Sequence, residues 1–225
     1  MNAIPVLHAV TNDEIVGRAG FIEQARSVMR ALGARGAVQL RATKLSRDHP
    51  DRFLELALTL AEEQERTGAW LVINDRVDVA LIACARGVQL TTRSLQVLDA
   101  LQVILKVSEC DDNPSAATTA IGGSVHSLEE GIATRIAGAT WGVAGNVLSA
   151  PRDADPESGP LLLDRLVRYS GIPIVVIGGI APQHVASLKQ KGAYGVAAIR
   201  GIWDVDHPER AVIDYLSAYD SQLGR

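Results

Sequence analysis

The residues best suited to bind an anion lie near the C-terminus, in two similar segments. Residues 172–180 and 194–202 are mostly apolar, and each reaches glycine just before a helical pattern begins. Glycine at such a point leaves backbone N–H groups uncovered, and two neighbouring turns of this kind can hold a phosphate. The alternative is that these glycines only permit tight turns. The residues expected to bind a phosphorylated small molecule are Gly178, Gly179, Arg200 and Gly201.

His126 is the residue placed best to move protons. It follows the apolar segment that ends at Gly122-Gly123, and the ordinary pKa of histidine, close to neutrality, suits proton transfer. The alternative is that His126 is a loop histidine with no chemical role. The other histidines lie inside the first predicted strand (His8) or at predicted helix starts (His49, His184 and His207).

Further polar residues stand where predicted strands end. If the strands form one barrel, these side chains share a single mouth with the glycine turns. Taken singly, Arg41 could be a surface residue, and Asn74-Asp75 could cap the following helix. The candidates for substrate binding are Gln39, Arg41, Asn74, Asp75, Gln89, Ser124 and Asn146.

Short apolar segments alternate with helical patterns about eight times along the chain. Segments that are apolar at every position indicate strands covered on both faces, as in a parallel sheet. We expect one (β/α)8 barrel domain over residues 1–225, with an open doubly wound sheet as the alternative. No glycine fingerprint of a dinucleotide-binding fold follows the first strand. The predicted strands are 5–10, 37–41, 69–73, 88–90, 118–123, 139–144 and the two segments above; the predicted helices are 17–32, 51–67, 77–85, 127–137, 161–169, 182–191 and 208–223.

The region between the fourth and fifth predicted strands combines helix, strand and loop signals. Residues 94–101 suggest a helix and residues 103–107 a strand, and the polar stretch 110–117 suggests an inserted loop. Ser127 with Glu130 has the spacing of a capping box and predicts a helix start. Residues 145–160 are rich in Pro, Asp and Gly and predict a long loop.

Composition excludes several classes of function. The chain has 225 residues, of which 47% are hydrophobic, and a net charge of −4 with scattered bases, so nucleic acid is not an expected partner. The cysteines, Cys84 and Cys110, lack metal-ligand spacing and suggest a reducing cytoplasm. No signal peptide and no apolar run of the ~20 residues needed to cross a bilayer is apparent. A homo-oligomer is left open.

Five blocks give the sequence a resemblance to the thiamine phosphate synthase/TenI superfamily over nearly its whole length. The family fold is the (β/α)8 barrel, and the resemblance implies a thiazole phosphate or thiamine phosphate as ligand. The blocks are Val38–Arg41 (VQLR), Ile73–Ala80 (INDRVDVA), Gly87–Leu90 (GVQL), Ile121–Glu130 (IGGSVHSLEE) and Ile174–Ile180 (IVVIGGI).

The resemblance implies one of two activities. Thiamine phosphate synthases join a pyrimidine pyrophosphate to a thiazole phosphate with magnesium, and three of their features are changed in this sequence. Thr43 stands at a lysine position, with Lys44 one step later, and Ser94 stands at the position of a second metal-binding aspartate. The loop after the sixth strand also lacks the family's lysine between Asn146 and Arg152. Asp75 alone is a poor magnesium ligand set.

These departures favour the TenI-like thiazole tautomerase branch, whose isomerase reaction aromatises a carboxythiazole phosphate without a metal. In this reading His126 carries the proton, Arg41 lies near the substrate carboxylate, the glycine turns hold the phosphate, and no cofactor is required. The alternatives are a thiamine phosphate synthase, which requires Mg²⁺, and a non-catalytic barrel that binds thiazole or thiamine phosphate.

Overall fold

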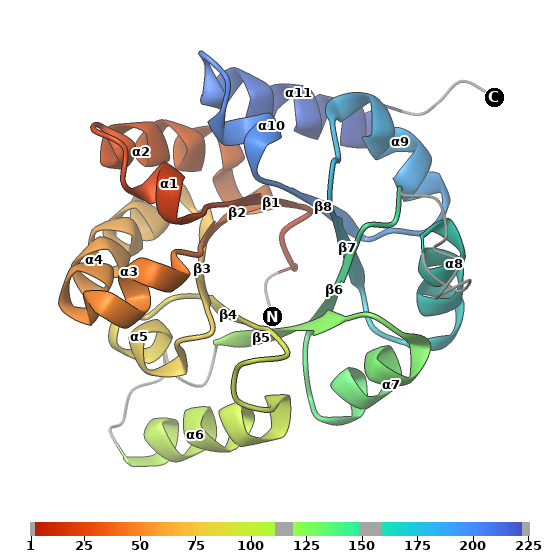
Figure 1. Ribbon diagram of the computed structural model, residues 1–225, viewed down its shortest axis with the longest axis horizontal. Coiled ribbons are helices and arrows are strands. Elements are labelled where there is room, and N and C mark those ends of the chain that lie inside the picture. The colour runs from red at the N-terminus through yellow and green to blue at the C-terminus, as the bar shows by residue number, and fades with distance from the viewer. Residues whose placement is uncertain (1–2, 111–118, 149–158, 222–225) are drawn as a thin grey trace.

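A computed structural model of the chain describes residues 3–110, 119–148 and 159–221. Its strands are all parallel and follow chain order around a closed barrel, because the first strand pairs with both the second and the last (Figure 1). The predicted single (β/α)8 barrel is confirmed, and the open sheet is wrong. The strands are β1 Leu7–Val10, β2 Gly36–Leu40, β3 Trp70–Asn74, β4 Gly87–Leu90, β5 Ala120–Val125, β6 Trp141–Gly145, β7 Ile174–Ile177 and β8 Gly195–Ala198.

The helices surround the ring of strands (Figure 1). Most of them join one strand to the next, which is the connection that parallel strands require. They are α1 Asp13–Val16, α2 Phe21–Leu32, the 3₁₀ turn η1 Gly33–Arg35, α3 Thr43–Asp48, α4 Pro50–Thr67, α5 Val77–Ile82, α6 Val97–Cys110, α7 Leu128–Ile136, α8 Pro160–Tyr169, α9 Pro182–Gln190, α10 Arg200–Trp203 and α11 Pro208–Asp220.

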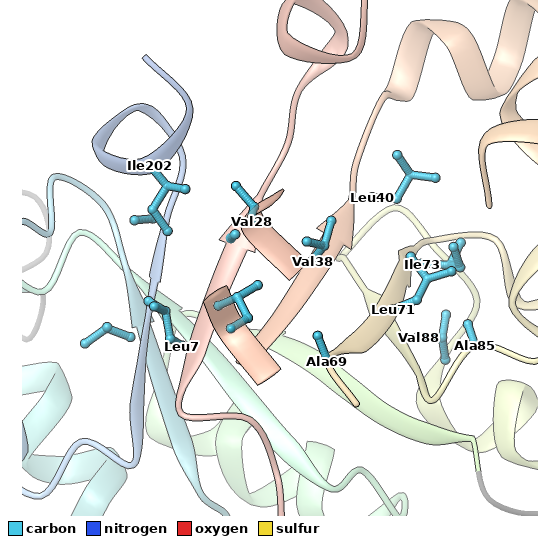
Figure 2. Packing of buried hydrophobic residues seen from close by; sticks show 14 of the residues in the cluster. Leu7, Val28, Val38, Leu40, Ala69, Leu71, Ile73, Ala85, Val88 and Ile202 are labelled. Atoms are coloured by element: carbon cyan, nitrogen blue, oxygen red, sulfur yellow. The ribbon is translucent and has the colours of Figure 1, made fainter. Parts of the chain in front are cut away.

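Alternate residues of each strand face the helices and the barrel interior. Leu40 and Ile73 belong to the larger cluster, which packs the strands against the helices, and Figure 2 shows part of it. The smaller cluster fills the barrel and includes Val72 and Trp141. Gly122 makes room for that indole, since a Cβ there would lie 2.2 Å from the Trp141 ring. The strands are therefore covered on both faces, as their unbroken apolar sequences predict.

The segment after β4 differs from its prediction. Residues 97–110 form the single helix α6, so the predicted strand at residues 103–107 is wrong. Ala100 and Ile104, one helical turn apart, are buried, whereas Val103 and Leu105 are exposed. A short apolar run fits a strand or a helix equally well, and only the side chains that find partners decide between them.

The helix predicted over residues 17–32 begins later, at Phe21, and the short helix α1 precedes it. Asn12 caps the short helix α1 by accepting a hydrogen bond from the Ile15 N–H at 2.8 Å. Gly20, with φ +81°, separates α1 from α2. The predicted cap at Ser127 is confirmed, because its hydroxyl accepts a hydrogen bond from the Glu130 N–H at 3.1 Å.

Among the described residues, no helix is both long and apolar enough to span a membrane. The predicted insertion at 110–117 falls almost entirely outside the described residues, as does most of the predicted loop at 145–160.

Candidate active site

A chain of hydrogen bonds joins the carboxyl ends of β2 and β3. Gln39 and Asn74 are both buried, and the Gln39 side-chain amide donates to Asn74 Oδ1 at 2.7 Å. The Asn74 amide in turn donates to Asp75 Oδ2 at 2.6 Å. These amides lie at the strand ends because parallel strands bring their carboxyl ends to one face of a barrel. The structure therefore brings these three predicted residues together.

Asp75 connects this chain to the loop after β4. Its φ of +64° turns the backbone sharply after β3, and its N–H donates to the Gln89 carbonyl. Oδ1 accepts hydrogen bonds from the Thr91 N–H at 3.1 Å, from the Thr91 hydroxyl at 2.8 Å and from the Ser94 hydroxyl. The side chain thus holds the β4–α6 loop, and the alternative role as a cap of α5 is wrong.

This arrangement does not fit a magnesium ion. Magnesium favours carboxylate oxygens in octahedral geometry. Here a hydroxyl, Ser94, stands beside the single carboxylate of Asp75, and hydrogen-bond donors already surround both carboxylate oxygens. Within the described residues, no three His, Cys, Asp or Glu side chains form a cluster that could hold a metal. A bound ion would have to displace the Ser94 and Thr91 hydroxyls.

A cavity of about 510 Å³ opens beside Asp75, where α3 passes the ends of β2 and β3. Thr43, Ser46 and two arginines contribute to its wall. The Arg76 guanidinium donates to the Ser46 carbonyl at 3.2 Å and pairs with Asp78 at 2.6 Å. Arg47 pairs with Asp48 at 2.8 Å. Hydroxyls and guanidinium groups are typical ligands of phosphate oxygens.

A second cavity, of about 590 Å³, lies over the ends of β7 and β8. We call it the glycine-turn cavity; Gly178, Gly179, Ile180, Arg200, Gly201 and Asp204 are among its lining residues. Gly178 and Gly179 have φ values of +114° and +65°, a region that favours glycine. A Cβ on Gly179 would meet no atom within 4 Å. The turn therefore presents bare backbone to open space, as phosphate binding requires.

Tyr215 of α11 contacts the backbone that lines this cavity. Its hydroxyl donates to the Ile180 carbonyl at 2.6 Å, and burial raises the pKa of the phenol to about 12. A Cβ on Gly201 would lie 2.3 Å from the same hydroxyl. Gly201 is thus required for close packing, whereas the positive φ values of Gly178 and Gly179 fit the tight-turn alternative as well as an anion site.

The other predicted residues are distributed around the mouth. Arg41 follows β2 and is half-buried, with its backbone N–H bonded to the Thr11 hydroxyl. Asn146 follows β6 with φ +57°, and its backbone N lies 3.0 Å from where a Gly178 Cβ would be. Gln89 points into the barrel and accepts a hydrogen bond from the Trp141 indole at 2.9 Å. Ser124 lines a cavity against α6 and α7.

His126 lies at the rim, where its side chain is 60% exposed. Its Nδ1 is 3.1 Å from Glu130 Oε2, and its backbone N–H donates to the same oxygen at 2.7 Å. Both contacts are with the first turn of α7, and none of the contacts that the structure gives this ring joins it to the glycine-turn cavity. The expected role of His126 as the proton carrier beside a phosphate held by those turns therefore has no support in the geometry.

His8 is the histidine with the most altered chemistry. It is fully buried in the barrel, where Nε2 approaches the Pro5 carbonyl at 3.2 Å and the ring packs against Trp141. Burial lowers the pKa of the imidazole from 6.5 to about 4. Nδ1 has no hydrogen-bond partner within the described part of the chain. The neutral ring is therefore a core residue of the barrel.

Sequence reasoning missed three residues that shape these cavities. Thr91 follows β4 directly, so the rule that found Asn74 could have found it as well. Arg18 and Asp204 form a contact between segments 186 residues apart, and no local pattern signals such a pair.

The polar side chains and bare glycine turns lie at the carboxyl ends of the strands, which is where (β/α)8 barrel enzymes bind their substrates. The position of the site is therefore the one typical of the (β/α)8 barrel class. The model of the thiamine monophosphate synthase family matches residues 7–202, and the chain belongs to this family.

Individual relatives agree with this assignment. The chain is 31% identical to the thiamine-phosphate synthase of Methanoculleus marisnigri, over 93% of this chain and 94% of that protein. It is 36% identical to the thiamine biosynthesis bifunctional protein ThiM/ThiE of Symbiobacterium thermophilum, but covers only 32% of that longer protein. The structure of the thiamine phosphate pyrophosphorylase of Pyrococcus furiosus is similar with a TM-score of 0.77 at 28% identity, over 97% of this chain and 98% of that one.

The comparisons contradict the predicted isomerase. These relatives are named as synthases or as a pyrophosphorylase, so the thiazole tautomerase reading is wrong for function and for enzyme class. That reading gave three changed positions more weight than the match along the whole barrel. It also relied on His126, which the structure places at the exposed rim.

Proposed function

We propose that the protein is a thiamine-phosphate synthase, a transferase that joins a pyrimidine pyrophosphate to a thiazole phosphate. The observation that carries the proposal is the match of the synthase family over residues 7–202, together with relatives of that name that align over nearly the whole barrel. The presence of two separate cavities at one barrel face supports it, because the reaction brings together two phosphorylated substrates.

In the proposal, each cavity binds the phosphate groups of a different substrate. In the proposal, the phosphate of the thiazole binds the backbone of Gly178 and Gly179, with Arg200 and Gly201 on the other side of the glycine-turn cavity. The pyrophosphate binds in the cavity of about 510 Å³, against the hydroxyl and guanidinium groups of Thr43, Ser46, Arg47 and Arg76. Arg41, Gln39, Asn74, Gln89, Ser124 and Asn146 contribute to the surface between these two anchors.

The chemical step requires stabilisation of a leaving anion. The carbon–oxygen bond of the pyrimidine substrate breaks and its electron pair leaves with pyrophosphate, while the thiazole nitrogen supplies the pair for the new carbon–nitrogen bond. Positive groups fixed near the leaving oxygen lower the barrier for such a departure. Arg47 and Arg76 are the cations of the described cavity wall, and Asp75 keeps the neighbouring loop in place. No step is assigned to a metal, because the donor set around Asp75 does not fit one.

The test is formation of thiamine phosphate from the two substrates by the purified protein, with Gly179→Ala as the variant. An added Cβ enters the space intended for the phosphate, so kcat/KM for the thiazole phosphate should fall about tenfold or more. The control is Gly68→Ala, which has a similar φ of +76° at the end of α4. This variant carries the same backbone strain and should keep its activity. Absence of product from the wild-type protein would reject the proposed function.

A further inference from the structure

An ion pair, Arg18–Asp204, borders the glycine-turn cavity. Arg18, in the loop between α1 and α2, donates to the Trp203 carbonyl at 2.7 Å and to Asp204 Oδ1 at 2.6 Å. Trp203 ends the short helix α10, and its buried indole packs against Phe21 at the start of α2. Arg18 therefore joins the first βα loop to the segment that closes the barrel mouth after β8.

The charge at this position opposes the proposed ligand. Asp204 is a carboxylate in the lining of the glycine-turn cavity. A carboxylate beside a phosphate repels it, and the repulsion is stronger at a partly covered site than in open water. The Arg18 guanidinium offsets this charge from the side of α1, and hydrogen bonding to Asp204 in turn raises the pKa of Arg18. The pair thus offsets the charge of Asp204, and Arg200 is the other charged residue in the lining. Glu14 lies 3.5 Å from the same guanidinium on the side of α1.

We propose that Arg18 is a positioning residue of the phosphate site: it neutralises Asp204 and holds residues 203–204 so that the glycine-turn cavity accepts a phosphate monoester. This inference rests on the proposed function, since it assumes that the cavity binds the phosphate of a substrate. Arg18 acts through Asp204 and Trp203, and in the structure it contacts both directly.

The chain contains a matched pair at the opposite end of the barrel. Arg35 lies immediately before β2 and donates to both carboxylate oxygens of Asp220, at 2.8 and 2.6 Å. This pair also joins an N-terminal segment to a C-terminal one, and it is more exposed: 46% and 58% for Arg35 and Asp220, against 32% and 36% for Arg18 and Asp204. Exposed pairs of this kind contribute little to stability. Loss of either pair should therefore have a small effect on folding, and only the loss of Arg18 should affect the phosphate site.

The experiment measures binding of the thiazole phosphate by calorimetry at low salt, with inorganic phosphate as a second probe. Arg18→Met should weaken binding about tenfold, because it leaves Asp204 without its counter-charge. Asp204→Asn should bind at least as tightly as the wild type. The double variant should recover most of the loss, and Arg35→Met should match the wild type. Thermal unfolding of each variant provides the measure of folding.

Several results would overturn the inference. If Arg18→Met binds as tightly as the wild type, the pair does not serve the phosphate site. If the double variant stays as weak as Arg18→Met, the effect does not pass through the charge of Asp204. If Asp204→Asn binds more weakly than the wild type, the carboxylate itself holds the ligand. Failure of the wild type to bind either probe would instead reject the glycine-turn cavity as a phosphate site, and with it the proposed role of the cavity.

Discussion

At the scale of single residues, the site depends on groups that are held by hydrogen bonds. Asp75 combines an unusual backbone angle with donors on both carboxylate oxygens, and these contacts fix the turn after β3 and the loop after β4 together. A residue in this conformation costs free energy that the surrounding contacts must offset. The carboxylate thus serves to organise the mouth of the barrel.

His8 gives the barrel a dependence on pH. The pKa of His8 is about 4 in the folded chain and 6.5 when exposed, so between these values the unfolded chain binds a proton that the folded chain does not. The free energy of unfolding should therefore fall as pH drops through this window. For His8 alone, the loss between pH 8 and pH 5 is about 2 kcal/mol. Denaturant unfolding of the wild type and of His8→Phe at the two values measures it.

His8→Phe should lose the part of the pH dependence of stability that is due to His8. His207→Phe, at an exposed helix start, is the control and should retain it. An identical loss of stability on acidification in the wild type and in His8→Phe would contradict the assigned role of the buried ring.

At the scale of elements, the strands position the site and their register leaves little space inside the barrel. Gly122 of β5 and Gly145 of β6 both lie on strands, but their surroundings differ. A Cβ on Gly122 would come within 2.2–2.3 Å of Trp141 and Gln89, whereas on Gly145 the nearest atom, in Ile177, is 4.0 Å away. The space beside Gly122 is thus fully occupied, whereas the space beside Gly145 could hold a methyl group.

Gly122→Ala should therefore destabilise the protein by about 1–3 kcal/mol through overpacking. Gly145→Ala should have a much smaller effect, because the new methyl group has room. The free energies of unfolding of the two variants in denaturant check this difference. Equal stabilities would show that the Trp141 indole moves aside freely.

At the scale of the whole molecule, much of the fold follows from the sequence. Apolar segments such as residues 172–177 alternate with helical patterns, and eight repeats predict a closed barrel. The candidate site residues were predicted from strand ends, and the structure brings Gln39, Asn74 and Asp75 into contact. The helix α6 was only partly predicted, because its apolar run also fits a strand.

The remainder of the site depends on distant contacts. The bond from Arg18 to Asp204 joins segments 186 residues apart, so no local pattern reveals it. Thr91, which bonds to Asp75, follows β4 and is within reach of the strand-end rule. The choice between transferase and isomerase could not be made from a few changed residues. Thr43 and Ser94 depart from the synthase pattern, and that departure alone favoured the wrong class. The match over residues 7–202 corrected it.

The central claim is that the glycine-turn cavity binds the phosphate of the thiazole substrate while the pyrimidine substrate loses its pyrophosphate. One measurement tests it most directly: ³¹P NMR of the protein mixed with both substrates. The account predicts that the thiazole phosphate signal changes on binding, and that free pyrophosphate and thiamine phosphate then accumulate in equal amounts. A thiazole phosphate signal that the protein leaves unchanged, with no pyrophosphate released, would contradict the account.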